Sequence, residues 1–226
     1  MTDPVTSSGS RRCAGLLLAA GGGTRMGNPK ALVTLDDELL VDRAASVLRD
    51  GGCEPVAVVL GAEADQVRHR ASLGDAVVVD NPAWESGQAS SLRVGISTVA
   101  GMAVTACAVL VAVVDQPGLT APVVRRLVDR WHAGVAPVVV ASYTGRPRNP
   151  VLFDSSVLAD VAAAVTGDEG ARGWLAERRA SDPGSVVLVE CGDIGDPTDV
   201  DTPADLTQWR VSRSEAVPHV AIRSDP

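Results

Sequence analysis

Leu16 to Lys30, which reads LLLAAGGGTRMGNPK, combines a buried strand with a loop suited to anions. The stretch begins within an apolar run, 14–20, whose length is typical of a buried β-strand. Three glycines and two cations, Arg25 and Lys30, follow within one short loop. Glycines let backbone N–H groups approach an anion closely, and the two cations add positive charge. The stretch therefore predicts a strand that leads into a polyphosphate-binding loop.

Two common phosphate-loop patterns do not fit this stretch. The dinucleotide pattern G-x-G-x-x-G requires a third glycine where Met26 stands, and the P-loop pattern requires lysine where Asn28 stands. An ordinary glycine-rich turn with solvated cations is the alternative. The position of the loop, directly after the first apolar run, favours a nucleotide site, because ligands of open α/β sheets bind at the carboxyl ends of strands.

Apolar runs alternate with segments of helical periodicity along most of the chain. Strands are expected at 14–20, 55–60, 76–79, 106–114, 137–142, 151–153 and 186–189. Helices are expected at 39–48, 62–71, 90–99, 122–132, 157–165, 171–179 and 203–209. This alternation predicts an α/β fold with a mostly parallel central sheet covered on both faces. We expect one domain, 12–210, between flexible tails at 1–11 and 211–226.

Composition excludes several classes of function. The chain has 226 residues, of which 46% are apolar, and it contains one Phe, one Tyr and four Trp. So few aromatic residues argue against base-stacking platforms for single-stranded nucleic acid. The formal net charge of −8 argues against nonspecific binding to nucleic acid or to anionic membranes. With no signal peptide, membrane span or C-x-x-C pair evident, we expect a cytoplasmic protein without a cysteine metal site.

Asp115 directly follows the most apolar run of the chain, so it should lie at the carboxyl end of a central strand. The glycine loop should lie at the same edge of the sheet. A carboxylate there suits Mg²⁺, which takes one or two protein carboxylates and fills its other positions with water and phosphate oxygens. Capping of the turn that begins at Gln116 is the alternative role for Asp115.

A third feature is the acidic segment 192–205, GDIGDPTDVDTPAD. Thr202 and Pro203 predict a helix start, with Thr202 as the N-cap and Pro203 at the first helical position. Most of the acidic residues in this segment are therefore expected to be structural. Asp201 is the one that we expect to complete the metal site, if the segment folds back onto the strand edge.

Together these motifs resemble the nucleotidyltransferases with a Rossmann-like α/β fold, and within them the molybdenum-cofactor branch. The first motif resembles the signature L-A-A-G-x-G-x-R-M-G-x-x-K, and the match continues to Leu206. The other matching motifs are at 81–84, 87, 90–92, 115–117, 145–146, 149–153, 167–172 and 199–206. The Leu-Ala-Ala-Gly form at 18–21 resembles the cytidylyltransferases, whereas guanylyltransferases typically have Leu-Ala-Gly-Gly. One departure is 148–150, Arg-Asn-Pro, where many relatives have a step like Gly-His-Pro, which puts the acceptor in doubt.

The resemblance implies a three-layer nucleotidyltransferase fold and transfer of CMP from CTP to a molybdopterin-type acceptor, with Mg²⁺ as cofactor and release of pyrophosphate. It implies Lys30, Arg25 and Asp115 as catalytic residues and Asp115 with Asp201 as metal ligands. The implied nucleotide-binding residues are Ala19, Ala20, Gly21, Gly22, Gly23, Thr24, Arg25, Lys30, Ser90 and Ser91. The implied acceptor-binding residues are Gln116, Asn149 and Arg172.

Several alternatives stay open at this point. Helix capping explains Ser90 and Ser91 about as well as phosphate contact does, and Trp84 fits either a substrate mouth or a core plug. The donor could be GTP, and the acceptor could be a sugar phosphate. A non-catalytic nucleotide-binding accessory protein of a molybdoenzyme is an alternative from another class. That alternative would be favoured by loss of Lys30 or Asp115, and both are present.

Overall fold

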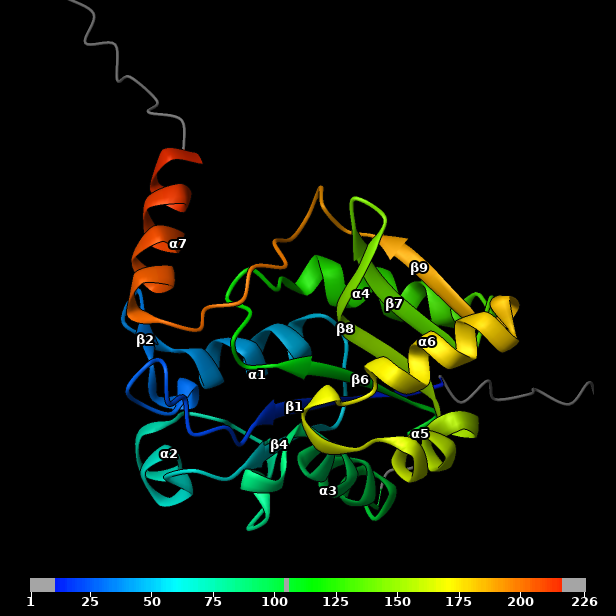
Figure 1. The fold of residues 1–226 in the computed structure, drawn as a ribbon, viewed down its shortest axis with the longest axis horizontal. Coiled ribbons are helices and arrows are strands. Elements are labelled where there is room, and N and C mark those ends of the chain that lie inside the picture. The colour runs from blue at the N-terminus through cyan, green and yellow to red at the C-terminus, as the bar shows by residue number, and fades with distance from the viewer. Residues whose placement is uncertain (1–10, 104–105, 217–226) are drawn as a thin grey trace, which may run out of the picture.

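The computed structural model describes residues 11–103 and 106–216, and within them seven strands form one large sheet (Figure 1). The order of the strands is β5-β4-β1-β6-β8-β7-β9. Their bounds are β1 Cys13–Ala19, β4 Val56–Leu60, β5 Val77–Asp80, β6 Ala108–Val113, β7 Val138–Tyr143, β8 Arg146–Asp154 and β9 Val186–Glu190. Four neighbouring pairs are parallel, and β8 runs antiparallel to both β6 and β7. The predicted mostly parallel sheet is confirmed.

Strand β1 lies inside the sheet, and the chain leaves it in two directions. From β1 the chain adds β4 and β5 on one side, and then returns to add β6 on the other side. The register pairs Leu18 of β1 with Val113 of β6, so the two strands end side by side. Such a reversal leaves a crevice at the carboxyl ends of the two strands, where ligands of open α/β sheets bind. The glycine loop begins at this crevice, and Asp115 lies beside it at the end of β6.

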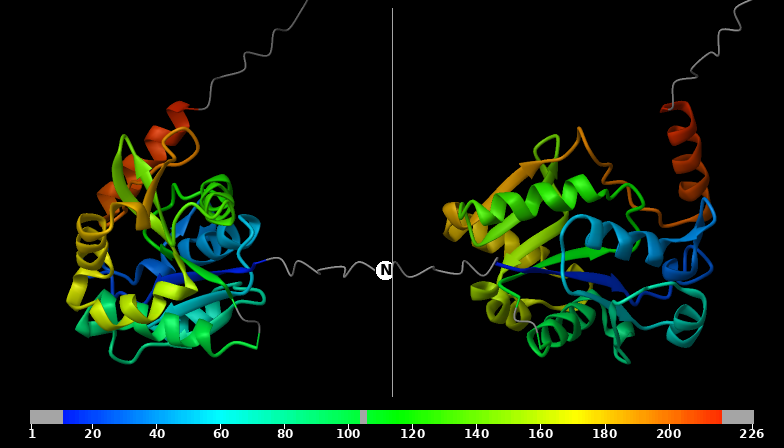
Figure 2. Two further views of the ribbon diagram at one scale, coloured as in Figure 1. Left: turned by 90° about the vertical axis from the view of Figure 1, so that its right-hand side faces the viewer. Right: turned by 180° about the vertical axis from the view of Figure 1, so that it is seen from behind.

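Helices cover both faces of the sheet, as the views in Figures 1 and 2 show. Helices α1 and α4 pack on one face, and α3, α5 and α6 pack on the other. The bounds are α1 Leu40–Asp50, α2 Ala64–Arg70, α3 Gln88–Ala100, α4 Ala121–His132, α5 Leu158–Ala164, α6 Arg172–Ser181 and α7 Pro203–Ala216. The molecule therefore has three layers, helices, sheet and helices.

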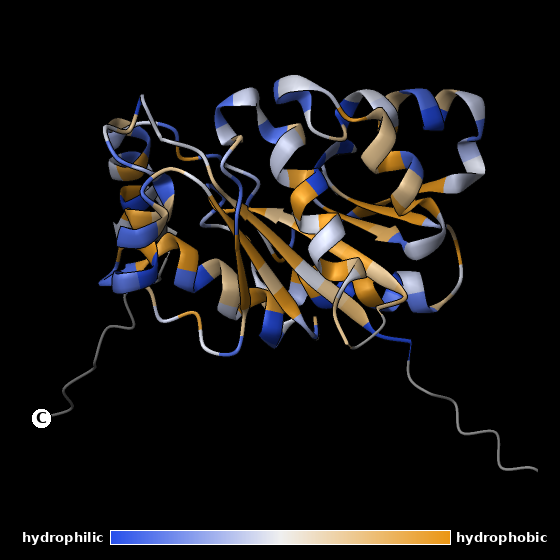
Figure 3. Ribbon diagram, turned by 90° about the horizontal axis from the view of Figure 1, so that it is seen from below, coloured by the Kyte–Doolittle hydropathy of each residue, from blue (hydrophilic) through white to orange (hydrophobic). Residues whose placement is uncertain are grey.

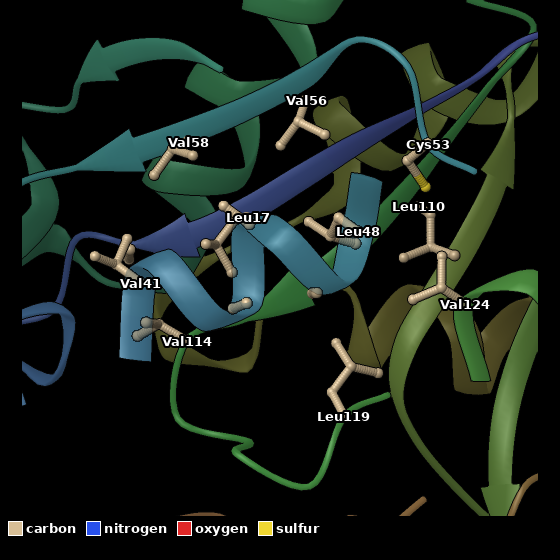
Figure 4. Packing of buried hydrophobic residues seen from close by; sticks show 14 of the residues in the cluster. Leu17, Val41, Leu48, Cys53, Val56, Val58, Leu110, Val114, Leu119 and Val124 are labelled. Carbon is tan, nitrogen blue, oxygen red and sulfur yellow. The ribbon is translucent and has the colours of Figure 1, made fainter. Parts of the chain in front are cut away.

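The side chains of β1 show why both layers are needed. Alternate residues of a strand point to opposite faces, and here Leu17 joins the core on the α1 and α4 side while Leu16 and Leu18 join the other core. Figure 4 shows Leu17 with Leu48 of α1 and Val124 of α4 in the first core. In Figure 3 the strands are mostly hydrophobic, and the helices carry hydrophilic residues as well. A strand that is apolar on both faces requires burial on both, which explains the unbroken run that predicted it.

Strand β8 is longer than predicted, and it runs antiparallel to its neighbours. We expected a brief strand at 151–153, but β8 extends over nine residues, Arg146–Asp154, and is antiparallel to its neighbours. Pro147 and Pro150 made its first half look like a loop, because proline cannot donate to a strand ladder. The pairing with β7 instead shifts register between Val140 and Ala141, which leaves Pro150 out of the pairing, while Pro147 lies opposite Ser142.

The C-terminal helix is also longer than predicted. It begins at Pro203, as expected, with the backbone N–H of Asp205 donating to Thr202 Oγ1 at 3.2 Å. The expected end at Trp209 and the expected tail from 211 are wrong as far as 216, because α7 continues through Ala216. Arg210 anchors the helix by donating to the carbonyl of Thr34 at 2.9 Å. Residues 1–10 and 217–226 of the expected tails lie outside the described residues.

Two further features complete the fold. Strands β2 (Thr34–Leu35) and β3 (Glu38–Leu39) form a small hairpin around the acidic turn at 36–37, which we did not predict as strand. Among the helices at 11–103 and 106–216, none combines the length and the hydropathy that crossing a bilayer requires.

Candidate active site

The glycine loop turns sharply after β1 and brings Lys30 back beside the end of that strand. Gly23 has φ +59, and a Cβ at this position would lie 2.0 Å from the carbonyl oxygen of Asn28. The Gly23 carbonyl accepts hydrogen bonds from the backbone N–H groups of Met26 and Gly27, each at 2.9 Å. The turn therefore requires glycine at position 23, both for its backbone angle and for its close contact.

Trp84 packs against this loop. A Cβ on Gly22 would lie 2.9 Å from Trp84 Cη2, and one on Gly61 would lie 2.7 Å from Trp84 Cβ. The indole is half-buried and lines the cavity at the end of β1. Of the two roles left open by the sequence, the structure favours the mouth of the site. Gly21, in contrast, faces open space, since a Cβ at this position would meet no atom of the described residues within 4 Å.

Lys30, Asp115 and Asp201 meet at the crevice between β1 and β6. Lys30 Nζ lies 2.6 Å from Asp115 Oδ2 and 2.5 Å from Asp201 Oδ1. Arg25 Nη2 lies 3.0 Å from the other carboxylate oxygen of Asp201. The backbone N–H of Val200 donates to the carbonyl of Asp115 at 2.8 Å, which ties the acidic segment to the end of β6. The expected return of this segment to the strand edge is therefore seen.

The charges of this cluster stabilise one another. Burial alone lowers the pKa of Lys30, but its attraction to Asp115 and Asp201 and its hydrogen bonds to them outweigh burial, so its pKa is raised. The hydrogen bond from Lys30 lowers the pKa of Asp201, although partial burial opposes it. Asp199 behaves differently, since burial, with the negative charges of Asp115 and Asp201, raises its pKa despite a hydrogen bond from Gln116. The cluster is thus ionised at neutral pH at Lys30 and Asp201.

A first cavity, of about 510 Å³, opens over this cluster. It is lined by most of the residues predicted for the nucleotide, namely Ala20, Gly21, Gly23, Thr24, Arg25, Lys30 and Ser91, and by the predicted metal ligands Asp115 and Asp201. Ala19, Gly22 and Ser90 do not line it: Ala19 is paired inside the sheet, and Gly22 packs on Trp84. The Ser90 hydroxyl donates to the carbonyls of Gly87 and Ala83 instead. The Ser90 hydroxyl is therefore engaged by the start of α3, and its contact with nucleotide stays a prediction.

Asn81 explains why the serine pair is oriented as it is. Its side-chain amide donates to Ser90 Oγ at 2.8 Å and to Ser91 Oγ at 3.0 Å, and its residue is almost fully buried. Asn81 follows β5, so this contact fixes the start of α3 to the end of a strand. Of the two serines, only Ser91 reaches the cavity.

A second cavity, of about 600 Å³, adjoins the first, since Leu18, Gln88 and Val113 line both. The three residues predicted for the acceptor, Gln116, Asn149 and Arg172, all line this second cavity. Gln116 is buried, and its amide donates to Asp199 Oδ1 at 2.9 Å. The structure thus separates the predicted nucleotide and acceptor residues into two neighbouring spaces that meet at the end of β1.

Comparison with known proteins decides the family. Residues 15–182 match the family model of the MobA-like NTP transferase domain. The chain belongs to this family. The chain is therefore a nucleotidyltransferase of the MobA-like type, as its sequence predicted.

Three proteins that are similar to this chain carry different names. Nicotine blue oxidoreductase of Paenarthrobacter nicotinovorans is 39% identical over 194 residues, covering 83% of this chain and 91% of that protein. Molybdenum cofactor guanylyltransferase of Rhodobacter capsulatus is 30% identical over 199 residues, covering 87% and 94%. The structure of Rv0371C of Mycobacterium tuberculosis in complex with manganese is 27% identical, with a TM-score of 0.67 over 89% of this chain and 99% of that chain.

The carboxylate pair fits a divalent cation. Asp115 Oδ1 is buried and has no hydrogen-bond partner among the described residues, so an oxygen ligand is left over at this point. In the part of the chain that the structure describes, no group of three or more Asp, Glu, His or Cys side chains gathers as a metal site. Two carboxylates with phosphate and water in the other positions is a common arrangement for Mg²⁺.

Sequence reasoning gave no role to several residues that line the two cavities. Gln88 lines both, and Asp168 and Glu85 line the first. Asp168 reaches the site because Gly87, with φ +108, packs so tightly on the segment 167–168 that a Cβ would lie 2.5 Å from the Gly167 carbonyl. Gly87 and Asp168 lie in motifs that resemble the family. Their contact, between α3 and the segment before α6, joins residues about 80 positions apart, so no local sequence pattern predicts it.

Proposed function

We propose that this protein transfers a nucleoside monophosphate, CMP from CTP, to the terminal phosphate of a molybdopterin-type acceptor and releases pyrophosphate. The observation that carries the proposal is the cluster of Lys30, Asp115 and Asp201, which lines the first cavity, and the second cavity adjoins that space. A donor in the first cavity and an acceptor in the second would meet at this cluster.

The chain's own groups suit an in-line displacement at the α-phosphorus. The backbone of Gly21 and Gly23 would bind the triphosphate, and Arg25 would neutralise its outer phosphates. An acceptor phosphate oxygen forms a bond to the α-phosphorus while the bond to the β-phosphate oxygen breaks, and pyrophosphate takes the electron pair. Lys30 would stabilise the charge that develops during this step, which is the dominant form of catalysis in phosphoryl-type transfer. No nucleophilic side chain is required, because the acceptor phosphate is already anionic.

A divalent cation, Mg²⁺ by preference, belongs to the proposal. Asp115 and Asp201 would hold it, and it would neutralise phosphate charge at the reacting centre. Lys30 contacts both carboxylates in the structure, so its ammonium must share them with the cation or move toward the phosphates when substrate binds.

The choice of base rests on one methyl group. Ala20, which is Gly in the guanylyltransferase form of the motif, is among the residues that line the first cavity, so its methyl group would narrow the space for a base. A narrower cavity favours cytosine over guanine. GTP is the second candidate donor, and it is favoured by similarity to the protein named molybdenum cofactor guanylyltransferase.

Other reactions have weaker support. Similarity to the protein named nicotine blue oxidoreductase suggests a redox reaction as an alternative. Against it, Met26 stands where a dinucleotide-binding loop needs its third glycine. For transfer to a sugar phosphate, the hydroxyl groups would find partners only among polar lining residues such as Gln116 and Asn149, because the other buried side chains of the second cavity are apolar. A non-catalytic accessory protein of a molybdoenzyme would have no need of a lysine held between two carboxylates.

Pyrophosphate release tests the proposal directly. The purified protein is incubated with Mg²⁺, molybdopterin-type cofactor and CTP, GTP or ATP in turn, and a parallel series replaces the acceptor with glucose 1-phosphate. We expect release with CTP and cofactor. Release with GTP alone would reverse the base assignment, and absence of release with every pair would refute nucleotidyl transfer to these acceptors. Oxidation of a reduced nicotinamide in the presence of a dye acceptor would instead support the redox alternative.

A further inference from the structure

The second cavity is lined by four arginine side chains, two from a strand and two from a helix. Arg146 and Arg148 come from the first half of β8, and Arg172 and Arg179 come from α6. Within the described residues, none of the four guanidiniums forms an ion pair or a side-chain hydrogen bond. This differs from Arg126, which forms a two-pronged contact with Asp193.

The concentration of charge is unusual for this chain. The protein as a whole has a formal net charge of −8, yet the lining of this cavity combines four arginines with only two carboxylates, Glu169 and Asp199. One of these carboxylates, Asp199, already accepts a hydrogen bond from Gln116. An excess of positive charge therefore remains at the rim of the cavity, and each guanidinium can bind a phosphate or carboxylate group in a bidentate manner.

The floor of the same cavity is apolar. It is formed by buried side chains of β6, β7, β8 and α3, namely Val111, Val140, Val151, Phe153 and Leu92. Such a floor can bury the face of a flat ring, whereas the hydrogen-bonding side chains of the lining, such as Gln116 and Asn149, lie outside it. Ligands that match both parts have an apolar face and more than one negative charge.

We propose that the second cavity is a site for a polyanionic acceptor with an apolar body, and that Arg146, Arg148, Arg172 and Arg179 select it. This inference rests on the proposed function for the identity of the acceptor, and it adds three acceptor-binding residues, Arg146, Arg148 and Arg179, that the sequence did not assign. The acceptor needs at least one anionic group in addition to the phosphate that attacks the nucleotide. Four guanidiniums around a single reacting phosphate would be far more than its charge requires.

The departure at 148–150 gains a reason from this arrangement. Arg148 is the first residue of the Arg-Asn-Pro step that departs from the motif of the resembled family, and it lines the cavity beside Asn149. The lengthened β8 brings both to the cavity, since it pairs with β7 as far as Arg146 opposite Tyr143. Arg148 thus adds a cation on the β8 side of the cavity, and Arg172 and Arg179 add two more on the α6 side.

The test measures binding and turnover separately. Binding of molybdopterin-type cofactor, glucose 1-phosphate and inorganic phosphate is measured by equilibrium dialysis on wild type, on the double variant Arg148→Gln/Arg172→Gln and on Arg130→Gln. Arg130 is an exposed residue of α4 that lines neither cavity, so it controls for the loss of charge alone. We expect the double variant to bind the cofactor at least tenfold more weakly, with a shallower dependence on salt and with unchanged CTP affinity.

Each outcome has a defined meaning. Equal cofactor binding by wild type and double variant would overturn the inference, and so would binding of glucose 1-phosphate as tight as that of the cofactor. If cofactor binding depends on the arginines but no nucleotide is turned over, the polyanion site stands and the proposed function fails. If turnover occurs and the double variant keeps the wild-type KM for the acceptor, the proposed function stands and the polyanion site fails. Circular dichroism of the double variant excludes misfolding as the cause of weaker binding.

Discussion

Lys30 and Asp201 are 171 positions apart in the chain, and the Lys30 ammonium lies 2.5 Å from the Asp201 carboxylate. Lys30 is also the only lysine among the 20 cationic Lys and Arg residues of the sequence. Every other cation is an arginine, whose planar fork would bind a carboxylate with a different geometry. A compact ammonium between Asp201 and Asp115 can instead exchange one oxygen contact for another as substrate binds.

Replacement of Lys30 should separate binding from chemistry. In Lys30→Met the developing charge loses its stabilising ammonium, so we expect kcat to fall by at least 100-fold, with nucleotide affinity reduced by less than tenfold. The two carboxylates also lose their resident cation, so Mn²⁺ should bind the nucleotide-free variant more tightly than it binds wild type. Electron paramagnetic resonance of free Mn²⁺ measures this affinity without any turnover.

Thr24→Ala is the matched control, because Thr24 lies in the same loop and the same cavity without contacting either carboxylate. It should keep the wild-type Mn²⁺ affinity. Normal turnover in Lys30→Met would contradict the assigned mechanism. Since the chain has a single lysine, ¹³C-methylation of amines gives one lysine signal, and addition of CTP with Mg²⁺ should shift it if the ammonium changes partners.

The ion cluster should also contribute to stability in a pH-dependent way. The pKa of Asp201 is lowered in the fold, chiefly by its hydrogen bond from Lys30, so its contribution is complete above the ordinary Asp pKa of about 4 and is lost as pH falls below it. The pKa of Lys30 is raised, so its contribution is complete below its ordinary pKa of about 10.4 and is lost at higher pH. Asp201→Asn should therefore cost about 1 kcal/mol between pH 5 and 9 and less below pH 4.

Urea unfolding at a series of pH values measures this difference. A constant difference between Asp201→Asn and wild type down to pH 3 would contradict it, because the ionised carboxylate would then not be the cause. Asp160→Asn on α5 serves as control, since Asp160 lies outside the cluster and forms no ion pair in the described chain.

The sequence allowed prediction of those parts of the site that follow strands. Lys30 and Asp115 could be assigned because the apolar runs before them mark two central strands, and the ends of parallel neighbours meet at one edge of the sheet. Arg146 and Arg148 could not, because two prolines hid the strand that carries them. The helix at the C-terminus was predicted too short because the polar residues after Trp209 gave no apolar face, although the chain still continues in helical conformation to 216.

Base preference should respond to a single methyl group. Ala20→Gly enlarges the first cavity beside the glycine loop, so we expect the ratio of kcat/KM for CTP to that for GTP to fall at least tenfold. Competition of the two nucleotides for pyrophosphate release measures the ratio. Ala19→Gly is the control, since Ala19 is buried in β1 and does not line the cavity. An unchanged ratio in Ala20→Gly would show that the base is read elsewhere.

Substitution by alanine should affect different properties at Gly21 and Gly23: CTP binding at the first and stability at the second. Gly23→Ala places a Cβ 2.0 Å from the Asn28 carbonyl at φ +59, so it should destabilise the fold by roughly 2 kcal/mol or more. Gly21→Ala meets no described atom within 4 Å, so it should leave stability unchanged while its methyl group weakens CTP binding at least tenfold. Thermal unfolding and equilibrium dialysis measure the two effects. If Gly21→Ala binds CTP as wild type does, the triphosphate does not lie against the backbone at this glycine, and the phosphate site must be placed elsewhere in the cavity.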